Sequence, residues 1–248
     1  MNKLLSIKNL SKVYYKGKME TEAIKDISFD IEEKEFVSIV GPSGCGKSTL
    51  LNILTNMDTL TKGSINLKEN LKLGYMLQSD SMLEWLTVLD NALLGLDIKK
   101  IKTKENIEYV KSLFEKYGLA EFMDKYPSEL SGGMRQRVAL IRTLALKPDI
   151  LILDEPFSKL DYQSRLKVSD DVYKIIKEEG KTALMVTHDI SEAISISDRI
   201  IVLSERPCTI KNIYKIKREK DKTPIENRKD KYFAYYYDCI WKDLAYHE

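Results

Sequence analysis

Gly41-Pro42-Ser43-Gly44-Cys45-Gly46-Lys47-Ser48 is the stretch of this 248-residue sequence that decides the fold. It follows the apolar run Phe36–Val40 and precedes Thr49–Leu54, so it joins a predicted strand to a predicted helix. Glycines let successive backbone N–H groups point inward around phosphate oxygens, and the helix N-terminus adds positive potential. Lys47 then reaches the β- and γ-phosphates, and the Ser48 hydroxyl coordinates Mg²⁺. The sequence therefore predicts a P-loop that binds ATP and Mg²⁺ through Gly41, Pro42, Ser43, Gly44, Cys45, Gly46, Lys47, Ser48 and Thr49.

Two carboxylates follow the apolar run Ile150–Leu153. A strand that ends in Asp154 and Glu155 places both side chains at the C-terminal edge of a sheet, beside the P-loop. Asp154 suits the Mg²⁺ sphere, and Glu155 can polarise the attacking water as a general base. Acidic residues often follow strands, so the pair by itself is weak evidence. Downstream of a P-loop it becomes strong evidence for an ATPase site.

Buried strands and helices alternate along the chain, which predicts an α/β fold around a mostly parallel sheet. Apolar runs of strand length occur at Phe36–Val40, Lys72–Leu77, Ile150–Leu153, Thr182–Val186 and Ile200–Leu203.

Two other regions of the chain have a different pattern. Leu5–Leu10 and Ile27–Ile31 alternate like half-exposed antiparallel strands, which predicts an antiparallel β-subdomain. From Trp85 to Leu146 the pattern is helical, with Ile107, Val110, Phe114 and Tyr117 on one helix face ended by Gly118. We interpret this region as a helical subdomain, at about residues 80–146, inserted between strands; ordinary crossover helices are the alternative.

The composition is that of an ordinary soluble protein. Forty basic and 38 acidic residues leave a formal charge of +2, so the overall charge favours no nucleic-acid partner. No run approaches the roughly 18 apolar residues of a membrane-spanning helix, and the N-terminus becomes polar too soon for a signal peptide. Cys45, Cys208 and Cys239 have neither metal-ligand spacing nor a disulfide framework, so we expect reduced thiols. These features predict a cytoplasmic protein whose association with a membrane is peripheral.

A third motif identifies the family. Leu130-Ser131-Gly132-Gly133-Met134-Arg135-Gln136-Arg137 resembles the signature motif of ABC ATPases. A Ser-Gly-Gly turn also caps a helix, here Met134–Leu146, and a helix N-terminus with free N–H groups is an anion site. The resemblance implies a head-to-tail dimer with a second copy of the chain, in which Ser131, Gly132 and Gly133 contact an ATP held by the partner subunit. It implies the P-loop NTPase core of these ATPases and hydrolysis of ATP.

Other positions match the family in the expected order over roughly residues 3 to 215. Tyr14 resembles the aromatic residue that stacks on adenine, and Gln78 resembles the glutamine that meets Mg²⁺. Asp161, in Ser158-Lys159-Leu160-Asp161, matches a loop that also acts in trans, although the family usually has alanine where Lys159 stands. His188, after the strand Thr182–Val186, matches the switch histidine at the γ-phosphate; a lone histidine without that context is more often structural. The expected catalytic residues are Lys47, Glu155 and His188, and the expected Mg²⁺ ligands are Ser48, Gln78 and Asp154.

The segment from Gln78 to Asn91 resembles importer ATPases for nitrate, sulfonate, taurine and related solutes, with Glu84 where a proline is common. The connection Asn66–Leu73 is shorter than in those relatives. The resemblance implies a stand-alone subunit that docks on permease subunits and acts indirectly with a solute-binding protein. We expect Met82, Leu83 and Trp85 to line the permease groove; the alternative is that they pack the helical subdomain.

The C-terminal region is more basic. Residues 205–231 contain ten basic and five acidic residues and precede Tyr232–Tyr237. We expect an ABC ATPase domain at 3–220 and a helical tail at 221–248 packed on the core, with His247 incidental. A soluble ABC ATPase acting on nucleic acid is one alternative, which steeply salt-dependent DNA or RNA binding would favour. The other alternative is a regulatory protein that binds ATP without hydrolysing it. Loss of ATP hydrolysis in Glu155→Gln, with retained ATP binding, would exclude this alternative.

Overall fold

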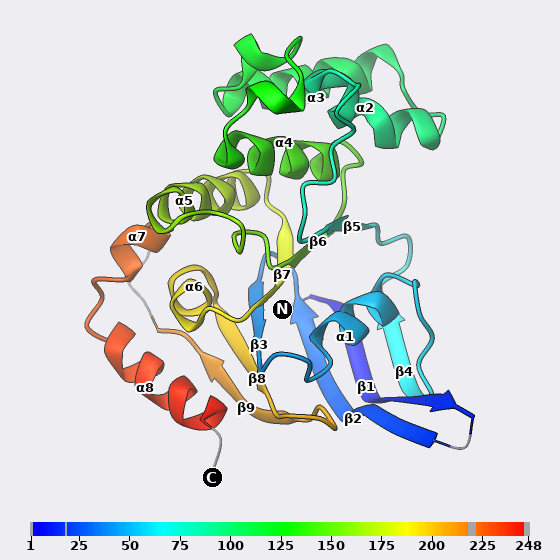
Figure 1. Cartoon of the computed structure of the whole chain (residues 1–248), viewed down its shortest axis with the longest axis vertical. Helices are drawn as coiled ribbons and strands as arrows, with labels where there is room; N and C mark the ends of the chain where they lie inside the picture. Colours follow the sequence, from blue (N-terminus) through cyan, green and yellow to red (C-terminus); the bar gives the residue numbers. More distant parts are fainter. Residues whose placement is uncertain (1, 18, 218–221, 246–248) are drawn as a thin grey trace.

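A mixed sheet lies at the centre of the computed structural model, which describes residues 2–17, 19–217 and 222–245 (Figure 1). Its strands follow the order β5-β6-β7-β3-β8-β9. The first five of these run parallel, and β9 pairs antiparallel with β8. The strands are β3 (Phe36–Val40), β5 (Leu73–Met76), β6 (Ile150–Asp154), β7 (Thr182–Thr187), β8 (Arg199–Leu203) and β9 (Ile210–Lys215).

The central strands are mainly apolar because both faces of the sheet are covered. On β6, Ile150 and Ile152 pack into a core shared with the N-terminal strands, whereas Leu151 and Leu153 pack into a core shared with the helical region. Successive side chains of a strand point to opposite faces, so a strand buried on both sides shows no polar alternation. This explains why the sequence contains continuous apolar runs here.

A smaller antiparallel sheet covers one face of the main sheet. Its order is β2-β1-β4, formed by β1 (Lys3–Lys16), β2 (Met19–Glu32) and β4 (Lys62–Leu67). The first two strands extend beyond the predicted segments, with pairing from Lys3–Glu32 to Lys16–Met19. Helix α1 (Lys47–Leu54) buries Leu50 and Leu51 in the core between the two sheets.

The chain between β5 and β6 forms a helical layer at one end of the molecule (Figure 1). On α3, Val110 and Phe114 are fully buried, and Gly118 with φ +67° follows the end of the helix. Helix α2 packs chiefly on α4 instead of on the sheet, an arrangement that ordinary crossover helices do not have. The elements are α2 (Val88–Ile98), α3 (Lys104–Lys116), the 3₁₀ turns η1 (Ala120–Phe122) and η2 (Pro127–Glu129), and α4 (Gly132–Leu144).

The remaining helices cover the other face of the main sheet. They are α5 (Tyr162–Glu178), α6 (Ile190–Ile196), α7 (Pro224–Asn227) and α8 (Phe233–Leu244). Tyr236 and Ile240 of α8 pack with Ile194 of α6 and Val202 of β8. Of the expected tail, Asp221 and residues 246–248, including His247, lie outside the described residues.

Part of the basic C-terminal stretch is a strand that the sequence analysis did not predict. Ile210–Lys215 forms β9 at the edge of the main sheet. Lysine is common on edge strands because its charge opposes pairing with another chain, so Lys211 and Lys215 suit this position.

The predicted fold class, an α/β P-loop core with an antiparallel subdomain and an inserted helical subdomain, is confirmed. Within the described residues, every helix is too short or too polar to cross a membrane.

Ile240→Ala should lower the free energy of unfolding by about 2–4 kcal/mol, because it empties a fully buried site between α8 and the sheet. Trp241→Ala is the matched control: Trp241 is 58% exposed, and its loss should cost about 1 kcal/mol or less. Urea denaturation measures both. Equal, small effects would show that α8 does not contribute to the core.

Candidate functional site

The P-loop connects β3 to α1 and is closed by two tight backbone turns. Gly44 and Gly46 have φ of +73° and +133°, a region that side chains rarely allow. A Cβ on Gly46 would lie 3.0 Å from the Ala23 carbonyl oxygen and 3.3 Å from Cβ of Cys208. The side of the loop that faces away from the phosphate site therefore packs closely against β2, and the opposite side borders a pocket. That pocket is lined by Ser43, Gly44, Gly46, Lys47, Ser48, Thr49, Glu155 and Arg206.

Lys47 supplies a buried positive charge at this pocket. Its side chain is 7% exposed, and Nζ donates to the carbonyl oxygens of Gly41 at 2.7 Å and Pro42 at 2.8 Å. These neutral acceptors hold the ammonium group in place beside the N-terminus of α1, whose first N–H groups have no acceptor within the helix. The structure thus gathers the positive potential that a phosphate requires.

Glu155 stands at the centre of a second cluster. It adopts φ +44°, an uncommon backbone conformation for a residue with a side chain, and its N–H donates to the Val186 carbonyl at 2.8 Å. Its Oε2 accepts from Nε2 of Gln78 at 3.0 Å, and its Oε1 lies 3.2 Å from Nδ1 of His188. The structure therefore brings together the predicted general base, glutamine and switch histidine.

Asp154, the residue before Glu155, is half-buried. Burial raises the pKa of its carboxyl, while a hydrogen bond from the Tyr75 hydroxyl at 3.1 Å and the charge of Lys47 act in the opposite direction. Burial and the nearby Asp154 charge raise the pKa of Tyr75, which keeps it a donor. The oxygen donors of Asp154, Ser48 and Gln78 are of the hard kind that Mg²⁺ prefers, so their chemistry suits the ion. Their assignment as its ligands stays a prediction.

Tyr14 lies on the antiparallel sheet. Its hydroxyl donates to Asp58 Oδ2 at 2.7 Å, and Nζ of Lys12 stands 4.8 Å from its ring centroid. Among the described residues, no hydrogen bond or ring contact connects Tyr14 to the P-loop. Its role beside adenine stays a prediction.

The signature residues lie in the helical layer and do not line the P-loop pocket of the same chain. Ser131 is the N-cap of α4 and accepts from the Met134 N–H at 3.3 Å, so the capping interpretation is correct. A Cβ on Gly132 would stand 3.0 Å from Cδ2 of Leu160, and one on Gly133 only 2.7 Å from Cγ2 of Val168.

Asp161 has a structural role in its own chain as well. It is the N-cap of α5 and accepts from the N–H groups of Gln163 at 3.1 Å and Ser164 at 3.0 Å. The hydrogen bonds from Ser164 lower the pKa of its carboxyl.

The expectation for the segment after Gln78 is partly wrong. Met82 is only 8% exposed and packs in the helical core, and Leu83 is half-buried, whereas Trp85 is 73% exposed. Asn91 explains the burial: its fully buried side chain accepts from the Leu83 N–H and donates to the Leu83 carbonyl.

Glu84 has a charged partner in the helical layer. Its Oε1 accepts from Nη2 of Arg135 at 2.7 Å. The same guanidinium donates to both carboxylate oxygens of Asp80.

The sequence analysis missed the contacts that Cys208 and Arg206 make with the P-loop. Cys45 and Cys208 are free thiols whose side chains are hydrogen-bonded to each other, although 163 positions separate them. The bond from Cys208 lowers the pKa of Cys45 to about 6, helped by the charge of Lys47, and it raises the pKa of Cys208. Arg206 donates through Nη2 to the Gly44 carbonyl at 2.8 Å. No sequence motif indicates that residues 204–209 meet the P-loop.

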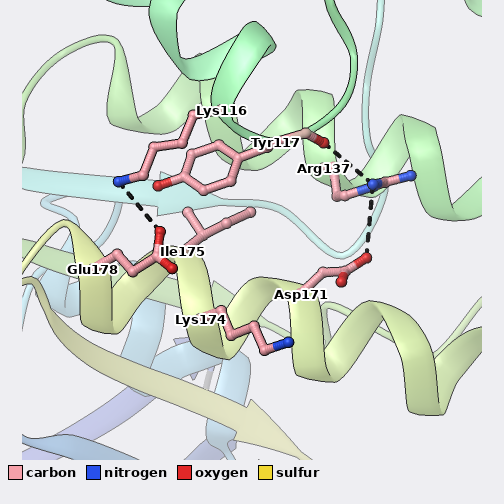
Figure 2. A pocket seen from close by; sticks show the side chains of 7 residues that line it. All are labelled: Lys116, Tyr117, Arg137, Asp171, Lys174, Ile175 and Glu178. Atoms are coloured by element: carbon pink, nitrogen blue, oxygen red, sulfur yellow. Dashed lines mark hydrogen bonds and ion pairs between the residues drawn. The ribbon is translucent and has the colours of Figure 1, made fainter.

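Another hollow lies between α3, α4 and α5, away from the predicted site (Figure 2). Arg137 Nη1 lies 3.7 Å from Asp171 Oδ2, and Lys116 Nζ lies 3.3 Å from Glu178 Oε2. Because carboxylates face both of these cations, this hollow is an ion-paired seam between the helical layer and α5. Its lining residues are Lys116, Tyr117, Arg137, Asp171, Lys174, Ile175 and Glu178.

Gly46→Ala should weaken Mg·ATP binding about tenfold or more, because the added Cβ meets the Ala23 carbonyl and the backbone conformation disfavours a side chain. Cys45→Ala is the control: its sulfur is buried behind the loop, so affinity should stay within about threefold. Titration calorimetry compares them. A larger loss in Cys45→Ala than in Gly46→Ala would contradict this account of the loop.

Glu192 makes the stability of the folded protein depend on pH. It is buried in α6, where Oε2 accepts from the Thr187 hydroxyl at 2.7 Å. Burial raises its pKa from 4.5 to about 7, against the hydrogen bond from Thr187. Between these values the folded state binds the proton more tightly than the unfolded chain, so this group's contribution to stability falls as pH rises and levels off above pH 7.

Glu192→Gln should therefore stabilise the protein relative to wild type by roughly 3 kcal/mol more at pH 8 than at pH 4.5. Denaturant unfolding at the two pH values measures this difference. An unchanged difference between variant and wild type across the range would contradict the raised pKa.

Comparison with known proteins agrees with this geometry. Residues 24–158 match the family model described as ABC transporter. An ABC transporter ATP-binding protein of Bacillus subtilis is 43% identical, covering 97% of this chain and 95% of that protein. A nitrate import ATP-binding protein of Synechocystis is 37% identical, covering 90% and 86%.

A solved dimeric ABC transporter cassette, MJ0796, aligns with a TM-score of 0.73 and 34% identity, covering 87% of this chain and all of that one. The family match spans more than half of the chain and includes the P-loop and both carboxylates. This chain therefore belongs to the ABC transporter family of ATPases.

Proposed function

We infer that this chain is the ATP-hydrolysing subunit of an importer for a small solute of the nitrate, sulfonate or taurine class. The observation that carries this inference is the cluster of Gln78, Glu155 and His188 at the edge of the P-loop pocket. A P-loop alone binds phosphate, whereas a carboxylate held next to it also provides a base for hydrolysis. The nitrate import relative supports the solute class.

The chain's own residues divide the chemistry between them. Lys47 exchanges its carbonyl partners for phosphate oxygens, and the Gly44 and Gly46 turns present backbone N–H groups to the same oxygens. Glu155 accepts the proton of the attacking water, and its bonds to Gln78 and His188 fix the orientation of its carboxylate. Ser48, Gln78 and Asp154 would hold Mg²⁺, which would neutralise part of the negative charge of the phosphates.

The active unit is a head-to-tail dimer of two copies of this chain. Ser131, Gly132 and Gly133 lie at a helix N-terminus that does not line the P-loop pocket of its own chain. Such an N-terminus attracts an anion, and the partner subunit's ATP is the anion that the signature motif reads in this family. The dimeric cassette among the similar structures supports the assembly of two copies. In this proposal Asp161 also acts across the interface.

The membrane partner is a permease, on which the chain docks from the cytoplasmic side of the cell membrane. We expect Trp85 to contact the permease, because its indole is 73% exposed beside the Gln78 segment and burial of this apolar surface against a partner is favourable. A solute-binding protein completes the importer without touching this subunit. ATP binding closes the dimer and pulls on the permease, and hydrolysis resets it.

Deleting the gene from its source organism should reduce uptake of labelled nitrate, taurine or an alkanesulfonate at least tenfold for one of the three. Wild-type protein should restore uptake. Glu155→Gln should not, although it should still bind Mg·ATP, because the amide cannot accept the proton of the attacking water. Unchanged uptake of all three solutes would reject the proposed solute class, and full restoration by Glu155→Gln would reject the role of hydrolysis.

A further inference from the structure

The loop between β8 and β9 is fixed against the back of the P-loop. Cys208 donates its N–H to the Ala23 carbonyl at 3.0 Å and accepts from the Lys25 N–H at 2.9 Å, which ties the loop to β2. The two ends of the loop are joined as well, since the Ser204 N–H donates to the Thr209 carbonyl at 2.9 Å. Residues 204–209 thus form a closed, anchored turn, so its backbone is already ordered and only the side chain loses conformational freedom when it binds a ligand.

Arg206 extends from this turn over the tip of the P-loop. Its Nη2 donates to the Gly44 carbonyl at 2.8 Å, and it lines the same pocket as Lys47, Ser48 and Glu155. The side chain is exposed. Within the described part of the chain, that bond is its only hydrogen bond, which leaves most of its five N–H donors available to a ligand.

We propose that Arg206 is a second cationic ligand of the nucleotide's phosphate chain, in addition to Lys47. The inference rests on the proposed function, because it names a further contact of the same ATP site. A guanidinium matches phosphate oxygens in two-pronged geometry and keeps its charge at any physiological pH.

The charges around the pocket explain why a second cation is useful there. Mg·ATP keeps an overall negative charge, whereas Asp154 and Glu155 already add acidic groups to the site. Lys47 is the buried cation on the inner side of the loop, and Arg206 stands at the outer side, against Gly44. Beside the loop tip, a Cβ built on Gly44 would meet no atom within 4 Å, so the approach of a ligand is open.

The alternative is a purely structural role, in which Arg206 only stabilises the P-loop tip through its hydrogen bond to the Gly44 carbonyl. The two roles differ in their response to salt. A contact between charges weakens as ionic strength rises, whereas a structural hydrogen bond to a neutral carbonyl contributes equally to ATP affinity at low and high salt.

The test is titration calorimetry with Mg·ATP in a Glu155→Gln background, which prevents turnover. Arg206→Gln should raise Kd about tenfold at 50 mM salt, and Arg206→Lys about threefold, since lysine keeps the charge but loses the fork. The deficit of Arg206→Gln should shrink toward twofold at 500 mM salt. Glu205→Gln, on the same exposed turn, is the matched control and should bind with unchanged or tighter Kd.

Two results would overturn the proposal. One is an Arg206→Gln protein that binds Mg·ATP as tightly as its parent. The other is a loss of Mg·ATP affinity that is equal at both salt concentrations and accompanied by a lower melting temperature without nucleotide, which identifies the structural role. Failure of the Glu155→Gln parent itself to bind Mg·ATP would instead reject the proposed function, and the proposal with it.

Discussion

The parallel register of four neighbouring strands determines where the chemistry of this protein occurs. In the order β5-β6-β7-β3, each strand ends at the same edge of the sheet. Gln78 follows β5, Glu155 follows β6, His188 follows β7, and the P-loop follows β3. Because adjacent parallel strands lie about 4.8 Å apart, four segments distant in sequence converge within reach of one ligand. The helices and the antiparallel sheet bury the two faces of this sheet and so maintain the register.

The local backbone at the strand ends is less relaxed than the strands themselves. Gly44, Gly46 and Glu155 all have positive φ, and Glu155 bears a side chain there. The bond from the Glu155 N–H to the Val186 carbonyl extends the pairing of β6 with β7 by one residue, which holds this conformation. A strained residue persists where surrounding structure fixes it, and such residues cluster at functional sites. The strain directs the Glu155 carboxylate toward Gln78 and His188.

The sequence predicts those parts of the site that are local or that follow from strand order. The P-loop, Asp154, Glu155, His188 and Gln78 each follow an apolar run, so their positions follow from the sheet that the runs form. Arg206 and Cys208 could not be predicted, because their contacts depend on how one loop packs behind another.

Met82 and Trp85 show a second limit on prediction. Both are apolar residues in a loop, and spacing alone does not separate the buried one from the exposed one. The difference comes from Asn91, whose buried amide bonds to the Leu83 and Thr87 carbonyls and sets the path of the loop. A polar side chain buried with its partners satisfied can specify a conformation that apolar patterning leaves open.

The signature residues and the Asp161 loop are mechanically linked within one chain. Gly132 and Gly133 have no side chain because Leu160 and Val168 occupy the space in which a Cβ would lie. Their contact places the N-terminus of α4 directly against the turn that ends in the Asp161 N-cap. A packed interface of this kind shifts as a unit and does not deform gradually. In the proposed dimer, the signature residues and the Asp161 loop would therefore approach the partner's nucleotide together.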